Sequence, residues 1–510
     1  MAVAMAVVGR AELAHAETLA DAITAAYQSN PNIQAQRAAM RALDENYTQA
    51  RAAYGLQASA AVSENYTYQK FVVAPSGDSA TTQSNQLSAT QSLYTSGRYA
   101  ARLGGIEAQI KSARENLRRI ELDLLVRISN AYVSVRRDRE VLRISQGGEA
   151  WLAKQLQDTQ DKYSVRQVTL TDVQQAKARL AAASTQVANA QAQLNVSQAF
   201  YASLVGHMPE TLEPEPDIDE LPANLDEAFN EAEQSNPSLQ AAMFTERASR
   251  LGVAEARAAR LPSVGARVDY RNAPYDPTQA KERFRQDSVT ASITLSQPLF
   301  SAGQLNSAVR QSIEENNRDK LLIDDARRNM VLSVSQYWDQ LIAARKSLAT
   351  IEDEMKADTI AFYGVREEER FALRSTIEVL NAQAELQNAQ LNFVRGRANE
   401  YVGRLQLLAQ VGTLEVGNLA PGVQPYDPER HFKKVRYRGM LPTDLIIQTL
   451  DHVALPLEAK KPKGGDTTPI RPPSSELPAK PISADKVTPP KSINDMPALD
   501  DSAIPTAPKG

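Results

Sequence analysis

The sequence contains two copies of one unit, arranged in tandem. The segment LADAITAAYQSNPNIQAQ near the beginning reappears 206 residues later as LDEAFNEAEQSNPSLQAA. The offset then holds without a gap, and the matched pairs include Asn30-Pro31 with Asn236-Pro237, Leu93-Tyr94 with Leu299-Phe300, Gly97 with Gly303, Tyr132 with Trp338, and Val205-Gly206 with Val411-Gly412. Chance does not keep one register over this distance, so the fold must be built from two equivalent halves.

The repeat divides the chain into five segments. Residues 1–16 begin with an apolar run that Arg10 interrupts and end in Ala14-His15-Ala16, which fits a small-residue cleavage site and predicts a secretory signal peptide. No Lys or Arg precedes the apolar run, so we expect the true start of this signal to lie upstream; a simple helical N-terminus is the alternative. The other segments are the first copy (17–212), the second copy (213–420), a short extension (421–455) and a Pro-rich tail (456–510).

Each copy contains two segments with a period of two, which is typical of strands that have one apolar and one polar face. Val289 to Leu295, for example, reads V-T-A-S-I-T-L. The strands are expected at about 58–72, 83–94, 262–272 and 288–298, with polar loops at 74–82 and 272–287. Two hairpins packed on a soluble domain would give the same pattern. However, no nearby segment can cover the apolar faces, and the lengths fit tilted membrane-spanning strands of ~9–11 residues.

Long helices follow the strands in both copies. Residues 98–164 and 303–371 contain no Pro and have apolar residues mostly at steps of three and four, which predicts helices of about 100 Å at 1.5 Å per residue. Return helices are expected at about 171–204 and 375–408. The turns therefore lie near Arg166-Gln167 and Ala372-Leu373, at one end of a long rod. A coiled-coil scaffold protein explains these stripes equally well, but it does not explain strands at the far end of both rods.

The composition argues against several functional classes. The chain has no cysteine, which excludes disulfides, thiol nucleophiles and a lipid-modified N-terminal Cys. The net charge is -4, with no basic block for nucleic acid. The four histidines are scattered, and there is no HExxH, GxSxG or phosphate-binding glycine loop, so an envelope hydrolase lacks its chemistry and we expect neither an enzyme nor a cofactor.

Residues 17–420 resemble the TolC-like outer-membrane factors. The resemblance rests on YSVRQVTLTDVQQAKARL and RSTIEVLNAQAEL at the two turns, and on LYTSG and QPLFSAG at the strand-to-helix junctions. It implies a mainly helical chain with a small β contribution, assembled as a homotrimer: a twelve-stranded barrel in the lipid of the outer membrane, over a helical tunnel in the periplasm. It also implies a periplasmic adaptor and an inner-membrane ABC or proton-driven transporter as partners, and the export of proteins (type I secretion), small toxic compounds, or both.

The resemblance further implies a gate at the closed end of the tunnel. Arg374 matches the family arginine that ties to a neighbouring Thr-Asp pair, here Thr171 and Asp172. Glu378 matches the first position of an acidic ring, but the second position is Asn381, where the best-known members have Asp. The ring would then carry three carboxylates per trimer instead of six. The closed end would depend more on the contacts of Arg374 with Thr171 and Asp172 than on the acidic ring.

The turns themselves are implied to contact the adaptor through Arg166, Gln167, Ala372 and Leu373. Arg166 and Ala372 stand where the family has glycines, and the family tyrosine near the second turn aligns with Glu369.

The C-terminal part has two characters. The extension contains HFKKVRYRG followed by the apolar LPTDLIIQTLDHVALP, which predicts a short docked segment without a known role; a tether to the cell wall or a passive extension are both compatible with it. The tail after it mixes prolines with charged and small polar residues and has too little apolar surface to fold, so we expect it to be disordered.

Overall fold

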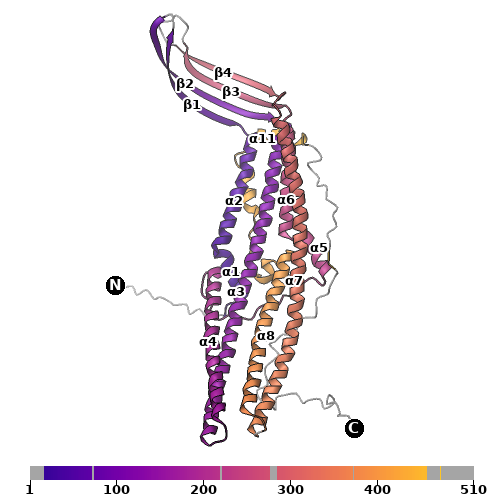
Figure 1. The fold of residues 1–510 in the computed structure, drawn as a ribbon. Helices are drawn as coiled ribbons and strands as arrows, with labels where there is room; N and C mark the ends of the chain where they lie inside the picture. Colours follow the sequence, from indigo (N-terminus) through magenta and orange to yellow (C-terminus); the bar gives the residue numbers. More distant parts are fainter. Residues whose placement is uncertain are drawn as a thin grey trace, which may run out of the picture.

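The computed structural model describes residues 16–71, 74–218, 221–275, 284–371, 373–455 and 471–472. A four-stranded sheet lies at one end of a long bundle of helices, and the helical hairpins reverse at the other end (Figure 1). This arrangement confirms the predicted class, mainly helical with a small antiparallel sheet. Residues 1–15 of the expected signal peptide, the turn residue Ala372 and almost all of the expected disordered tail lie outside the described residues.

The two copies contain the same elements in the same order. The first copy consists of α1 (Leu19–Ser29), α2 (Pro31–Arg51), the short 3-10 helix η1 (Ala52–Tyr54), β1 (Gln57–Phe71), β2 (Ala74–Tyr94), α3 (Arg98–Ser164) and α4 (Leu170–Val205). The second consists of α5 (Leu225–Ser235), α6 (Pro237–Ala258), β3 (Ser263–Tyr275), β4 (Phe284–Ser296), α7 (Gln304–Arg370) and α8 (Thr376–Val411). Both long helices have 67 residues and both return helices 36, as an ungapped repeat requires.

The repeated Asn-Pro pairs join the start of one helix to the end of another. Asn30 caps α2, since its Oδ1 accepts from the backbone N–H of Asn32 at 3.0 Å, and its Nδ2 donates to the carbonyl of Leu204 in α4 at 3.1 Å. Asn236 repeats both contacts in the second copy, with Leu239 at 3.0 Å and with the carbonyl of Gln410 in α8 at 2.7 Å. The proline that follows suits the first helical position.

The strand-to-helix junctions also follow one pattern. Ser96 and Gly97 have φ angles of 53° and 81°, and Ala302 and Gly303 have 47° and 84°. Two consecutive left-handed residues turn the chain sharply from strand into helix, and this explains the small residues and the glycine at the ends of LYTSG and LFSAG.

The strands form one antiparallel sheet in the order β1-β2-β3-β4, and the β2–β3 pair joins the two copies. The register aligns Leu87 with Tyr270, and Tyr270 with Val289, so the apolar residues of different strands share one face. The hairpins are longer than predicted. Residues 74–82, expected as a loop, form the start of β2 and pair with β1, and β3 and β4 likewise extend into the range expected as the second loop.

The largest core surrounds the upper and middle parts of α3 and includes residues of α8, and a second core surrounds α7. The repeat-equivalent Tyr132 and Trp338 are both fully buried, one in each half. The Tyr132 hydroxyl donates to the carbonyl of Glu17 at 2.9 Å and lies 2.8 Å from that of Glu213. This core holds the two halves as one body, from which the hairpins extend as thin pairs of helices (Figure 1).

After the second copy come α9 (Val416–Leu419), α10 (Glu429–Val435) and α11 (Pro442–Val453). The segment is docked: α10 contacts α2, and α11 contacts α3, η1 and the base of β2. The expected short docked segment is therefore present.

Candidate functional site

The free ends of the two hairpins begin their return helices with the same hydrogen-bonded cap. Thr169 precedes α4, and its backbone N–H and hydroxyl donate to Asp172 Oδ2 at 2.9 and 2.8 Å. Ser375 precedes α8 and makes the same contacts with Glu378 Oε2, at 2.8 Å each. The predicted gate acids are thus repeat-equivalent capping residues, which fix the start of each return helix.

Arg374 lies between two carboxylates of its own copy. Its Nε donates to Glu368 Oε2 at 2.7 Å and its Nη1 to Glu378 Oε1 at 2.9 Å, and all three side chains are about half exposed. The N–H and hydroxyl of Ser375, together with Arg374, lower the pKa of Glu378 to about 2. The pKa of Arg374 is raised by the same contacts with Glu368 and Glu378. Glu378 therefore carries a full negative charge at neutral pH.

Arg374 does not reach Thr171 or Asp172 within one chain. The Asp172 carboxylate is held in its own cap, and Thr171 is exposed at the start of α4. The contact of Arg374 with Thr171 and Asp172 that the resemblance implies therefore stays a prediction.

Two polar contacts at this end connect the copies, and the sequence analysis did not identify either. Lys162, near the end of α3, donates from Nζ to Glu369 Oε1 near the end of α7, at 2.6 Å. Glu369 is only 13% exposed and Lys162 is 37% exposed, so the pair is partly shielded from water. Only the alignment of Glu369 with the family tyrosine marked this position in advance.

The second contact involves Asn381, the predicted second position of the ring. Its Oδ1 accepts from Arg179 Nη2 of α4 at 3.1 Å. Asn381 therefore connects α8 of the second copy to α4 of the first. The residue before it, Leu380, packs with Leu152 and Ala183 in a small apolar cluster that joins α8 to α3 and α4.

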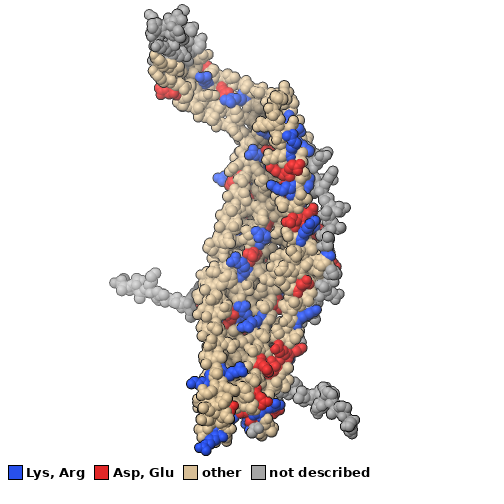
Figure 2. Space-filling view, viewed as in Figure 1, with Lys and Arg blue, Asp and Glu red and all other residues tan. Residues whose placement is uncertain are grey.

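The tips carry exposed apolar and basic side chains. Arg166 has a φ of 63°, the left-handed region that favours glycine, and this accounts for the glycine that the family has there. Arg166, Gln167 and Leu373 are all exposed, as is Phe371. Charged side chains of both signs gather around this end in Figure 2.

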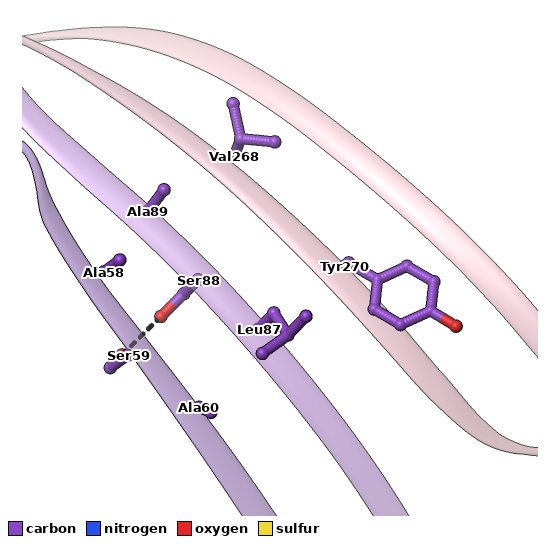
Figure 3. Close-up of a pocket in the computed structure, with 8 residues that line it drawn as sticks. All are labelled: Ala58, Ser59, Ala60, Leu87, Ser88, Ala89, Val268 and Tyr270. Carbon is purple, nitrogen blue, oxygen red and sulfur yellow. Dashed lines mark hydrogen bonds between the residues drawn. The ribbon is translucent and has the colours of Figure 1, made fainter.

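At the opposite end, one face of the sheet is apolar and uncovered. Ala58, Ala60, Leu87, Ala89, Val268 and Tyr270 line a shallow hollow on it (Figure 3). Side chains that alternate with these are polar, as in the pair of Ser59 and Ser88, whose hydroxyl oxygens lie 2.8 Å apart. On the outer strand, Ile293 is 75% exposed. A water-soluble chain would cover such a face.

The described residues contain neither a membrane-spanning helix nor a metal-binding cluster. No helix among them is both long and apolar enough to cross a membrane. Over the same part of the chain, the His, Asp and Glu side chains form no group of three or more that could hold a metal ion.

Comparison with known proteins identifies the architecture. The family profile for outer membrane efflux proteins matches residues 22–207 and again residues 228–413. The chain is 28% identical to the outer membrane efflux protein BepC of Brucella suis, over 83% of this chain and 92% of that protein. It is 23% identical to the outer membrane protein TolC of Escherichia coli, over 81% of this chain and 85% of that protein. In fold it matches the CmeC outer membrane channel of Campylobacter jejuni, with a TM-score of 0.69 at 11% identity, over 82% of this chain and 89% of that one.

Proposed function

Because the chain belongs to the outer membrane efflux protein family and is therefore an outer-membrane channel and not an enzyme, we propose that it works as a homotrimer whose sheets close into one barrel. The helices then form the periplasmic tunnel of a tripartite export system. The observation that carries this proposal is the four-stranded sheet, which has one apolar face and, in the single chain, unpaired edges at β1 and β4.

An open edge cannot stand in lipid, because each unsatisfied backbone group there costs several kcal/mol. Four strands are also too few to close a barrel, since membrane barrels begin at about eight. Pairing β4 of one chain with β1 of the next satisfies both edges, and three copies give twelve strands. The apolar face is then turned to lipid and the polar face to the lumen.

The test is the state of the protein after detergent extraction of outer membranes. We expect a trimer by size-exclusion chromatography with light scattering, and discrete conductance steps when it is added to planar bilayers. Recovery only as a soluble, monomeric rod without channel activity would refute the proposal and favour the alternative, a coiled-coil scaffold of the cell envelope.

We further propose that the hairpin tips form the periplasmic gate, with Glu378 in a ring on the threefold axis and Arg374 tied to Thr171 and Asp172 of the adjacent chain. Arg374 supports this because it is exposed and already gathers two carboxylates. Arg374→Ser, alone or combined with Asp172→Ala, is expected to loosen the closed end and raise single-channel conductance. Unchanged conductance in planar bilayers counts against the gate.

The exposed tip residues Arg166, Gln167 and Leu373, together with Ala372, are proposed to contact a periplasmic adaptor, which links the tunnel to an ABC or proton-driven transporter. Since the chain has no cysteine, Gln167→Cys provides a unique site for a photoactivated cross-linker in whole cells. We expect a cross-link to the adaptor from Gln167→Cys and none from Gln160→Cys, which is exposed higher on α3. Equal labelling at both positions would contradict the assignment.

The cargo is proposed to be proteins, small toxic compounds, or both. Deleting the gene separates these possibilities, through drug sensitivity on one side and the proteins missing from the medium on the other. A deletion strain unchanged in both would contradict an export role.

A further inference from the structure

Helix α11 is anchored to the first strand-to-helix junction by a buried carboxylate. Asp451 accepts hydrogen bonds from the backbone N–H groups of Thr95 at 2.9 Å, Gly97 at 2.9 Å and Ala100 at 3.2 Å. The hydroxyls of Thr95 and Tyr54 donate to it at 2.8 and 3.1 Å. The extension thus supplies the N-terminal cap of α3, and this fixes where α11 stands.

A second contact shows on which side of the sheet α11 lies. Asp444 Oδ1 accepts from Gln91 Nε2 at 3.3 Å. Gln91 follows Leu87 and Ala89 at alternate positions of β2, so its side chain belongs to the apolar face of the sheet. Helix α11 therefore lies at the foot of the apolar face, where the sheet meets the helices (Figure 1).

The amphipathic character of α11 is inverted relative to that of a helix on a water-soluble surface. Its buried face carries Asp444 and Asp451 with only one apolar residue, Ile447. Its outward face carries four large apolar residues that are between 52% and 78% exposed, Leu445, Ile446, Leu450 and Val453, and the exposed Thr449 and His452 lie beside them. A helix facing water has the reverse order, so this face is built for an apolar neighbour.

A basic segment precedes α11 and lies further from the sheet, along α2. Thr48 donates to the carbonyl of Val435 at 3.1 Å and Arg51 to that of Arg438 at 2.5 Å, which places residues 433–438 beside the upper end of α2. The segment reads KKVRYR and contains no acidic residue. Tyr437 is 60% exposed. Basic and aromatic side chains next to an apolar helix face suit the headgroup region of a membrane that contains anionic lipid.

We propose that α11 is an interfacial membrane helix. Its outward apolar face enters the acyl chains of the periplasmic leaflet of the outer membrane, and the basic segment 433–438 contacts anionic phospholipid headgroups. The inference rests on the proposed function in one respect, namely that the apolar face of the sheet is turned to lipid. The apolar surface of α11 continues that face downwards and widens the contact of each chain with the membrane.

The experiment uses the full chain, which has no native cysteine. Ile446→Cys and Leu450→Cys are labelled with an environment-sensitive fluorophore and reconstituted into vesicles of phosphatidylethanolamine and phosphatidylglycerol that contain spin-labelled lipid. Both positions are exposed in the chain, so the labels do not disturb its packing. We expect lipid quenching comparable with that at Ile293→Cys on the sheet, and none at Gln160→Cys on the tunnel. Changing Leu445 and Val453 to Ser should reduce the quenching at Leu450→Cys.

Each outcome separates the two proposals. Quenching at Ile293→Cys without quenching at Ile446→Cys and Leu450→Cys overturns the membrane role of α11 and leaves the channel intact. Absence of quenching at Ile293→Cys removes the proposed function itself. If the α11 labels are shielded from both lipid and water and cross-link between chains, a second copy covers this face, and the inference is wrong.

Discussion

The pair formed by Lys162 and Glu369 gives the sharpest test of the proposed gate. It joins the end of α3 to the end of α7, and opening the tip by separating these helices must break it. At 2.6 Å, with the carboxylate 13% exposed, its direct attraction is several kcal/mol at an effective dielectric constant of about 20. Desolvation and the ordering of two side chains offset most of this, and about 1 kcal/mol remains. Three copies per trimer would then stabilise the closed state by about 3 kcal/mol, a factor of roughly 100 in its population.

Lys162→Met keeps the length and apolar stem of the side chain but removes its charge. We expect longer and more frequent open periods in single-channel recordings, and Glu369→Met should act in the same way because it removes the same contact. The exchange Lys162→Glu with Glu369→Lys restores the pair with reversed polarity, and should return the open probability towards that of the natural protein.

The double variant separates a specific contact from a change in tip charge. The reasoning is refuted if the exchange is no better than the worse single variant, or if neither single variant alters gating. Lys154→Met provides the matched control, because it removes the same charge from an exposed position higher on α3.

Three further predictions concern charge, capping and turns. Because the pKa of Glu378 is lowered to about 2, its carboxylate stays charged until the pH falls towards 2, and cation selectivity should not change between about pH 7 and 5. A change of selectivity within that interval would contradict this. Asp451→Ala leaves several buried N–H donors unpaired, and each costs about 1–3 kcal/mol of stability. The 421–455 extension should then become sensitive to limited proteolysis in the folded trimer, and continued resistance would contradict this. Gly412 has a φ of 92°, and Gly412→Ala adds a Cβ that meets the backbone of Ser235. This variant should lower the thermal unfolding midpoint much more than Gly206→Ala at the equivalent position, where only the ~1 kcal/mol of the left-handed conformation is lost. Equal shifts would refute the steric argument.

The sequence predicted those features that local physics determines. The long helices were expected at 98–164 and 303–371 and lie at Arg98–Ser164 and Gln304–Arg370, because each run lacks Pro and starts after a glycine in the left-handed region. The apolar face of the sheet could also be predicted, because apolar and polar residues alternate along each strand. Contacts between distant segments were not visible: nothing local shows that Asp451 caps a helix some 350 residues away, or that Lys162 meets Glu369. Such pairs depend on the relative positions of packed helices.

The repeat also bears on how the hairpin tips could form the ring that we propose. Lys162 and Glu368 occupy equivalent positions in the two copies, and so do Val168 and Arg374. Six identical hairpin ends around an axis would carry like charges, and these would repel each other at close approach. The two hairpin ends of one chain differ in charge at these positions, since Lys162 is replaced by an acid in the second copy and the neutral Val168 by Arg374. In the ring that we propose, this divergence would reduce the repulsion between neighbouring ends. The seam inside a chain already shows the attraction, in the bond between Lys162 and Glu369. In the proposed trimer, Arg374 would contact Asp172 of the adjacent chain, a contact that the equivalent Val168 could not make.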